Sequence, residues 1–237
     1  MLNILQNMYL ITLLFLFILA GNALDKEGQC PIFQVSENSN SVTFLPNNVQ
    51  NSKNKVYKSK LREATMWHNC VNCEVALSNQ INLELRASYI YQLMAMHFDR
   101  DDVALKGFYK FFEHSSIEER EHASKLMKYM NKRGGNLLPH DIQKPDASKM
   151  NWESPLSALK EAFDLESLVY TSLRKLHDVA SISEDYHFMD YIESEFFVEQ
   201  VESLNQLSSY ITKLKRMGCG LGEALFDQEL LKSTESP

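Results

Sequence analysis

A glutamate and a histidine three residues apart interrupt an otherwise mostly apolar helical pattern. Glu119 and His122 belong to a stripe that recurs at alternating steps of three and four residues, with Leu105, Phe108, Phe112, Ser115, Leu126 and Tyr129. Such a stripe predicts the buried face of a helix, where a carboxylate is costly unless it is paired or binds a metal. Residues three apart on a helix are neighbours, so both side chains can bind one ion. A buried histidine beside a salt-bridged glutamate is the alternative that this pair alone leaves open.

Three further segments carry a polar group near the middle of an apolar face. These groups are Glu84 in residues 77–98, Glu166 in residues 156–180 and Gln200 in residues 189–211. The inward positions of the last segment are predicted to be Met189, Glu193, Phe196, Gln200, Leu204, Leu207 and Ile211. Four such helices packed as a bundle would bring the polar groups together with Glu119 and His122.

The expected cluster favours a metal site. Three ionised carboxylates repel strongly in a small volume of low dielectric, and a divalent or trivalent cation removes that repulsion. Oxygen and imidazole ligands suit iron. Because the pattern is similar to that of ferritin-like di-iron proteins, we predict a di-iron site in a four-helix bundle.

Composition favours an all-α protein. The 237 residues are 44% hydrophobic, which suffices for one sizeable core. Eight glycines and six prolines are few for this length and fall mostly outside the periodic segments. A net charge of -7 argues against a nucleic-acid partner and is compatible with attraction of cations.

The first 23 residues resemble a secretory signal peptide. They contain no Asp, Glu, Lys or Arg, and the apolar run from Tyr9 to Ala20 is short for a membrane span. Small residues follow at the cleavage position. We expect cleavage after Ala23 and a secreted protein without a membrane segment; a retained anchor is the alternative. Residues 24–62 are predicted to be a flexible extension, because Asn and Ser dominate residues 36–54.

Cysteine usage suggests a disulfide. In an oxidising compartment an even count of four cysteines permits such bonds. Cys70 and Cys73 resemble half of a zinc or redox motif, but no second pair and no preceding strand supports either. We therefore expect Cys30 to pair with Cys70 or Cys73, within or between subunits.

Turn signals set the order of the helices. The glycines after Arg133 end the second helix, and Ser154 with Pro155 begins the third. The connection between these helices is long enough to cross the full height of the bundle, so the two helices should be parallel. We predict a four-helix domain over residues 63–218, then a short apolar helix and tail over residues 219–237.

The chain is similar to the ferritins, specifically to their iron-oxidising heavy-type subunit, from about Asn72 to Leu231. The motifs that carry the resemblance are Ile81-Asn82-Leu83-Glu84-Leu85, Phe98 to Leu105, Glu118 to His122, Arg133-Gly134-Gly135, Lys144-Pro145-Asp146, Trp152-Glu153-Ser154, Glu199-Gln200 and Leu225-Phe226-Asp227. The resemblance implies a ferritin-like four-helix bundle with a long crossover between helices 2 and 3 and a short fifth helix. It also implies iron storage and detoxification.

The resemblance further implies a ferroxidase centre, where two Fe(II) are oxidised by dioxygen before ferric oxide mineralises. It assigns Glu84 and His122 to the first iron, Glu119 to both irons as a bridge, and Glu166 to the second. Gln200 is implied to position oxygen or water near the second iron.

Tyr91 lies on the same helix face as Glu84, and the resemblance places it beside the centre. There its hydroxyl would bind a ligand carboxylate, and its ring would serve as a local electron donor. A core aromatic residue is the alternative interpretation.

Assembly into a 24-subunit cage, alone or with a second subunit type, is also implied by the resemblance. Asp190, Glu193 and His177 would line channels through which iron enters, and Glu118 and Glu121 would nucleate the mineral. Without that resemblance, the acidic residues would be interpreted as a solvated helix end.

Two other classes of protein fit the sequence less well. A light-type, storage-only subunit lacks the equivalent of Glu119 or His122, and this chain has both. A rubrerythrin-like di-iron oxidase carries a second Glu-x-x-His, whereas positions 197 and 200 here are Phe197 and Gln200.

Overall fold

The computed structural model describes residues 60–70, 72–145 and 152–235, and within these ranges every regular element is a helix. Its elements in chain order are α2 (Lys60–Ala64), η1 (Trp67–Asn69), α3 (Cys73–Phe98), α4 (Lys106–Lys132), α5 (Pro155–Ile182), α6 (Tyr186–Ile192), the π-helical segment η3 (Glu193–Phe197), α7 (Val198–Met217) and α8 (Leu221–Glu235).

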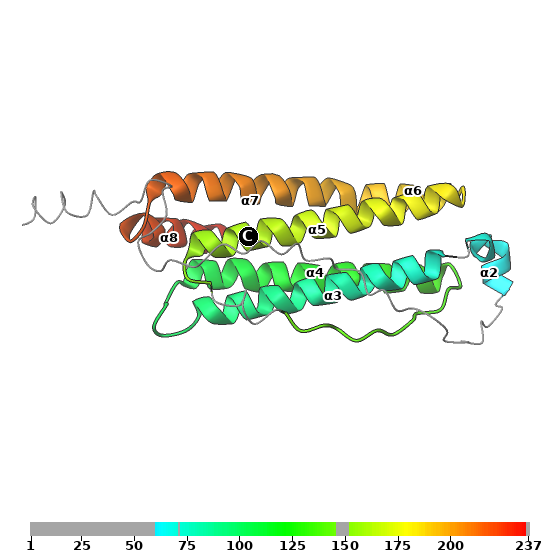
Figure 1. The fold of residues 1–237 in the computed structure, drawn as a ribbon, viewed down its shortest axis with the longest axis horizontal. Coiled ribbons are helices and arrows are strands. Elements are labelled where there is room, and N and C mark those ends of the chain that lie inside the picture. The colour runs from blue at the N-terminus through cyan, green and yellow to red at the C-terminus, as the bar shows by residue number, and fades with distance from the viewer. Residues whose placement is uncertain (1–59, 71, 146–151, 236–237) are drawn as a thin grey trace, which may run out of the picture.

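Four long rods form the bundle: α3, α4, α5, and the continuous run of α6, η3 and α7 (Figure 1). Helices α4 and α5 point in the same direction, because the chain returns along the bundle between them (Figure 1). Residues 134–145 of this connection lie on α3, where the amide of Leu138 donates to Ser78 Oγ at 3.2 Å. Asn82 Nδ2 donates to the Asp141 carbonyl at 3.3 Å. The expected all-α bundle with a long crossover and a fifth helix is confirmed.

The predicted stop and start signals act where expected. Gly134 follows α4 with a φ of 73°, a left-handed conformation that glycine adopts without strain. Ser154 caps α5 by accepting a hydrogen bond from the Ser157 amide at 3.1 Å, and Pro155 occupies the first helical position. These local signals fix where the third rod begins.

The apolar stripes of the sequence form the core. In α3 the residues at alternating steps of four and three are all buried: Leu77, Ile81, Glu84, Ser88, Tyr91, Ala95 and Phe98. At one end of the bundle, the rings of Phe98, Phe108 and Phe112 pack together, and Phe226 of α8 joins Phe108 with 5.7 Å between ring centroids. This packing attaches α8 to α4.

The fourth rod differs from its prediction. Phe188, Ile192, Phe196 and Gln200 are buried, whereas Met189 is only partly buried and Glu193 is exposed. These four buried residues follow one another at steps of four. In a regular α-helix with 3.6 residues per turn, three such steps would turn the last side chain away from the first. The π-helical segment adds one residue to a turn and brings the four buried side chains to one face. The predicted inward position Glu193 was therefore wrong, whereas Met189 is partly buried and packs against the core.

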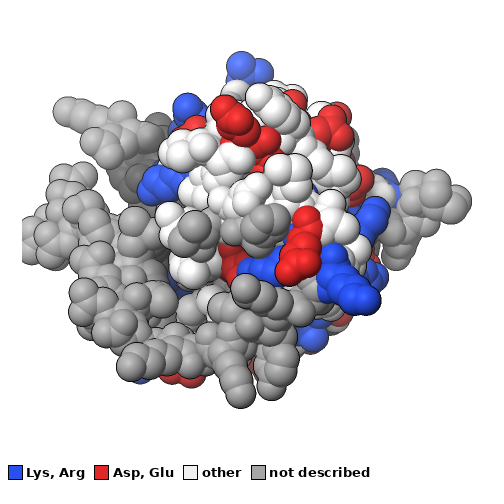
Figure 2. All heavy atoms as spheres, turned by 90° about the vertical axis from the view of Figure 1, so that its right-hand side faces the viewer, with Lys and Arg blue, Asp and Glu red and all other residues white. Residues whose placement is uncertain are grey.

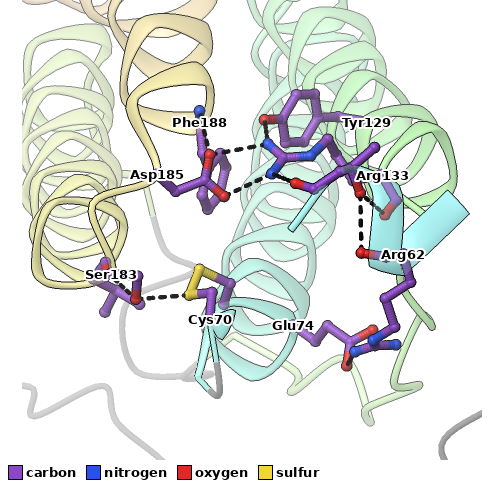
Figure 3. Close-up of a disulfide and its surroundings, with 11 residues drawn as sticks. Arg62, Cys70, Glu74, Tyr129, Arg133, Ser183, Asp185 and Phe188 are labelled. Carbon is purple, nitrogen blue, oxygen red and sulfur yellow. Dashed lines mark hydrogen bonds and ion pairs between the residues drawn. A yellow bond between two sulfur atoms is a disulfide. The ribbon is translucent and has the colours of Figure 1, made fainter. Parts of the chain in front are cut away.

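A short N-terminal cap, α2 with η1, covers one end of the bundle. Trp67 is fully buried there, and the guanidinium of Arg133 lies 4.8 Å from its ring centroid. Arg133 forms two hydrogen bonds with Asp185, at 2.7 and 3.1 Å, and donates to the Thr65 carbonyl at 3.0 Å (Figure 3). Helix α2 begins at Lys60, so it includes the last residues of the segment expected to be a flexible extension.

The disulfide at this end differs from the expected pairing. Cys70 and Cys73 are bonded to each other, so the prediction that either pairs with Cys30 was wrong (Figure 3). The turn into α3 places their Cα atoms 5.3 Å apart, within the range that a disulfide bridges. Ser183 donates a hydrogen bond to Cys70 Sγ at 3.0 Å. Cys219 is also disulfide-bonded, and Cys30 lies outside the described residues.

Helix α8 packs on α4 through a close backbone approach. The amide of Phe108 donates to Asp227 Oδ1 at 3.0 Å, and a Cβ on Gly107 would lie 1.9 Å from the Asp227 carbonyl oxygen. Leu230 is buried, but Leu221 and Leu225 remain exposed in the single chain. Among the described residues, no helix is both long enough and apolar enough to cross a bilayer.

Candidate metal centre

The bundle brings together the six side chains that the sequence placed in one site. Glu84 and Tyr91 come from α3, Glu119 and His122 from α4, Glu166 from α5, and Gln200 from α7, and all six are buried. One ligand atom from each of Glu84, Glu119 and His122 lies within 4.8 Å of the other two. Two carboxylates and one imidazole in this arrangement can hold a single cation.

Two carboxylate oxygens of the cluster have no hydrogen-bond partner among the described protein groups. Glu84 Oε2 and Glu119 Oε2 are buried and have no hydrogen-bond partner in the described structure. Burial, and then repulsion from a neighbouring carboxylate, raises the pKa of Glu84 and of Glu119 well above the ordinary value of 4.5. A cation between these oxygens would satisfy both and remove the repulsion.

Glu166 is held from two sides. The Tyr91 hydroxyl donates to Glu166 Oε1 at 2.5 Å, and Gln200 Nε2 donates to Glu166 Oε2 and, at 3.1 Å, to its carbonyl. Burial raises the pKa of Glu166, although both hydrogen bonds oppose this shift by stabilising the carboxylate. Glu166 raises the pKa of Glu119 by repulsion, and it lines the same cavity as Glu119 and His122. The four rods therefore each contribute to one centre.

Two residues that contact the cluster were missed by sequence reasoning. Gln80 is buried one turn before Glu84, and its Nε2 donates to Glu84 Oε1 at 2.8 Å. Glu199, next to Gln200, places Oε1 3.1 Å from His122 Nε2. Helical spacing puts Gln80 on the same face as Glu84, which is a usable signal, but the contact of Glu199 crosses between helices and has no local signature.

A cavity of about 1090 Å³ between α4 and α7 reaches the cluster. Glu118, Glu199 and Glu202 are among the acidic side chains that line it, and the buried residues Glu119, His122, Glu166 and Gln200 also line it. Acidic groups in a low-dielectric concavity raise the local concentration of cations. The cavity therefore joins the buried cluster to acidic side chains that attract cations.

The other predicted site residues lie outside the cluster. His177 Nε2 and Glu193 Oε1 are 2.7 Å apart, so these two are brought together, and Asp190 is exposed on α6 nearby in the chain. Glu118 is half-buried at the wall of the cavity, and its Oε1 lies 3.2 Å from His114 Nε2. Glu121 is exposed.

A crossover four-helix bundle with carboxylates and a histidine at its centre defines a class of helical metal-binding proteins. Residues 74–217 match the ferritin-like domain family. The chain is 55% identical over 161 residues to soma ferritin of Lymnaea stagnalis, a match that covers 68% of this chain and 91% of the relative. It is 52% identical over 159 residues to ferritin-1 heavy chain of Schistosoma mansoni, covering 67% of this chain and 91% of that one.

The chain belongs to the ferritin family, and the resemblance to a heavy-type subunit is confirmed. Iron storage is the general function that this membership supports.

Proposed function

We propose that this protein is a ferroxidase subunit, which oxidises Fe(II) with dioxygen and stores the product as ferric oxide mineral. The observation that carries the proposal is the buried cluster of Glu84, Glu119 and His122, with two carboxylate oxygens that have no partner among the described residues. Iron is the substrate of this site, and the donor set of carboxylates and imidazole suits it.

Each residue has a distinct task in this proposal. Glu84 and His122 hold the first Fe(II), Glu119 bridges to the second, and Glu166 holds the second. Carboxylates stabilise Fe(III) relative to Fe(II), so the donor set favours loss of one electron from each iron to dioxygen. Gln200 and Tyr91 act through Glu166, because both donate hydrogen bonds to it.

The proposal is tested by removing the bridging carboxylate and the imidazole together. Glu119→Ala with His122→Ala is expected to abolish rapid aerobic oxidation of Fe(II), followed by stopped-flow absorption, and to leave the assembled particle intact. Arg120→Ala, an exposed change between the two positions, is the matched control and should keep the parent rate. Oxidation by the double variant at the parent rate would contradict the assignment.

We also propose assembly into a 24-subunit cage, alone or with a second subunit type. Exposed apolar side chains support this: Leu221 and Leu225 on α8, and Ile182 and Tyr186 at the end where α5 meets α6. Figure 2 shows uncharged side chains gathered in the middle of that end, with acidic and basic ones around them. Burial between subunits would remove this surface from water. A native particle mass equal to that of a single chain would contradict assembly.

Channel and nucleation roles are proposed for residues away from the centre. Asp190, Glu193 and His177 would line channels where acidic groups attract Fe(II), with His177 and Glu193 already in contact. Glu118 and Glu121 would nucleate the mineral. Asp190→Asn with Glu193→Gln should slow oxidation at low Fe(II) and leave it unchanged at saturating Fe(II).

Location in the secretory pathway is proposed from residues 1–23 and supported by the Cys70–Cys73 disulfide, since such bonds persist in oxidising compartments. The mature chain would then consist of the extension (24–62), the four-helix domain (63–218) and the C-terminal helix and tail (219–237). N-terminal sequencing of the native protein should begin after Ala23, and recovery of an intact Met1–Ala23 segment would contradict secretion.

A further inference from the structure

The two ring nitrogens of His122 face different partners. Nδ1 lies 3.7 Å from Glu119 Oε1 inside the cluster, whereas Nε2 lies 3.1 Å from Glu199 Oε1. The side chain of His122 is 9% exposed, and that of Glu199 is 40% exposed at the wall of the cavity. The imidazole therefore spans from the buried centre to a carboxylate that solvent can reach.

This arrangement determines which nitrogen of His122 can bind a metal. A neutral imidazole carries one N–H and one lone pair, and only the nitrogen without a proton is a ligand. An acceptor at Nε2 holds the proton there and leaves the Nδ1 lone pair directed at the cluster. Metal-binding histidines commonly donate their other N–H to a carboxylate, which fixes both tautomer and ring orientation.

We propose that Glu199 is a positioning residue whose carboxylate accepts the Nε2–H of His122 and so holds Nδ1 toward the metal shared with Glu84 and Glu119. The inference rests on the proposed metal centre at these residues. Glu199 acts through His122 and is not itself a ligand.

Neighbouring contacts restrain both members of the pair. The buried ring of Phe196 packs edge-on against the His122 ring, with 5.7 Å between ring centroids. Lys125 Nζ lies 4.0 Å from Glu199 Oε2, so the lysine ammonium faces one carboxylate oxygen of Glu199 and the His122 ring faces the other. Because Lys125 lies one turn after His122, two residues of α4 hold a carboxylate of α7.

A carboxylate at the wall of a cavity has one competing role, direct binding of Fe(II) on its way to the centre. The two roles require different properties of position 199. Positioning requires a hydrogen-bond acceptor, which an amide oxygen also supplies, whereas ligation of a hard cation favours a charged oxygen. Glu199→Gln and Glu199→Leu therefore separate the two roles.

The test is a titration of the assembled protein with Co(II) alone, followed by visible absorption. Glu199→Leu is expected to raise the Kd about 10- to 100-fold, the range typical for loss of a partner that orients a metal ligand. Glu199→Gln should keep a Kd near the parent value. Gln206→Leu is the matched control, because Gln206 is uncharged and lines the same cavity about two turns further along α7. It should also keep the parent Kd.

Two results would overturn the proposal. If Glu199→Gln weakens binding as much as Glu199→Leu, the charge of residue 199 is required and the competing role holds. If Glu199→Leu keeps the parent Kd, the contact does not position His122. The proposed function fails in a different way, since Co(II) binding would then survive Glu119→Ala with His122→Ala.

Discussion

The Tyr91 hydroxyl donates a hydrogen bond to Glu166 Oε1 at 2.5 Å, joining α3 to α5 beside the cluster. Burial and the neighbouring carboxylates raise the pKa of Tyr91 well above 10.0, so the phenol keeps its proton and remains a donor. Its ring also stacks on Phe112, with centroids 6.1 Å apart. Tyr91 therefore combines packing in the core with a polar contact to Glu166, a proposed ligand.

Removing only the hydroxyl separates these two contributions. Tyr91→Phe keeps the ring and should slow aerobic Fe(II) oxidation about tenfold, because Glu166 loses one donor and keeps the one from Gln200. Stopped-flow absorption measures the rate, and thermal unfolding checks that the fold is unchanged. An unchanged rate would mean that Tyr91 is only a core aromatic residue.

Gln80 is predicted to orient Glu84. Gln80→Leu keeps a similar volume but removes the donor to Glu84 Oε1, and it should weaken anaerobic binding of Fe(II) about 10- to 100-fold. Isothermal titration calorimetry measures this affinity. Asn79→Leu, an adjacent change on a partly exposed position of α3, is the control and should bind as the parent does. Equal affinity for the parent and Gln80→Leu would exclude an orienting role.

Stability of the metal-free protein should depend on pH through the cluster. The folded protein raises the pKa of Glu84 and Glu119 above 4.5, so above that pH it binds more protons than the unfolded chain. The contribution of these carboxyl groups to stability is therefore full below pH 4.5 and is lost as the pH rises through their folded values.

Glu119→Gln removes one such group and tests this dependence. Calorimetry in the presence of a chelator gives the Tm of the variant minus the Tm of the parent. This difference should be more positive at about pH 8 than at about pH 5. With Co(II) in place of the chelator, the Tm of the parent should rise above that of Glu119→Gln at about pH 8, because the metal stabilises the protein that keeps its ligands. A Tm difference that does not change with pH would contradict the assigned shift.

The ion pair of Arg133 and Asp185 is predicted to hold the N-terminal cap. Their side chains are 7% and 11% exposed, and removing one partner of a buried pair costs about 3–5 kcal/mol. Arg133→Met should lower the Tm and shift the Trp67 fluorescence to longer wavelength, measured in a Trp152→Phe background. Arg100→Met is the control, because Arg100 and Asp102 are 56% and 58% exposed and a solvent-exposed ion pair contributes little to stability. Equal effects of the two changes would contradict the role of Arg133.

Much of the fold could be predicted because its signals are local. The stripe of α3 follows from the spacing of its own apolar residues, and the start of α5 follows from Ser154 and Pro155. The polar interruptions at Glu84, Glu119, His122, Glu166 and Gln200 also lie at helical spacing, so a bundle was enough to bring them together.

The remaining features depend on contacts between distant segments. The π-helical turn was missed because regular α-helical spacing was assumed through Glu193. The Cys70–Cys73 pairing was missed because spacing alone does not choose among cysteines. The contact of Glu199 with His122 depends on how α4 and α7 pack, which no short stretch of sequence specifies.

Anomalous diffraction from crystals soaked anaerobically with Fe(II) tests the ferroxidase centre most directly. Two iron positions are predicted in each subunit, one bound by Glu84, Glu119 and His122 and the other by Glu119 and Glu166. Iron found only at exposed acidic residues, with no anomalous peak between Glu84 and Glu119, would contradict the centre.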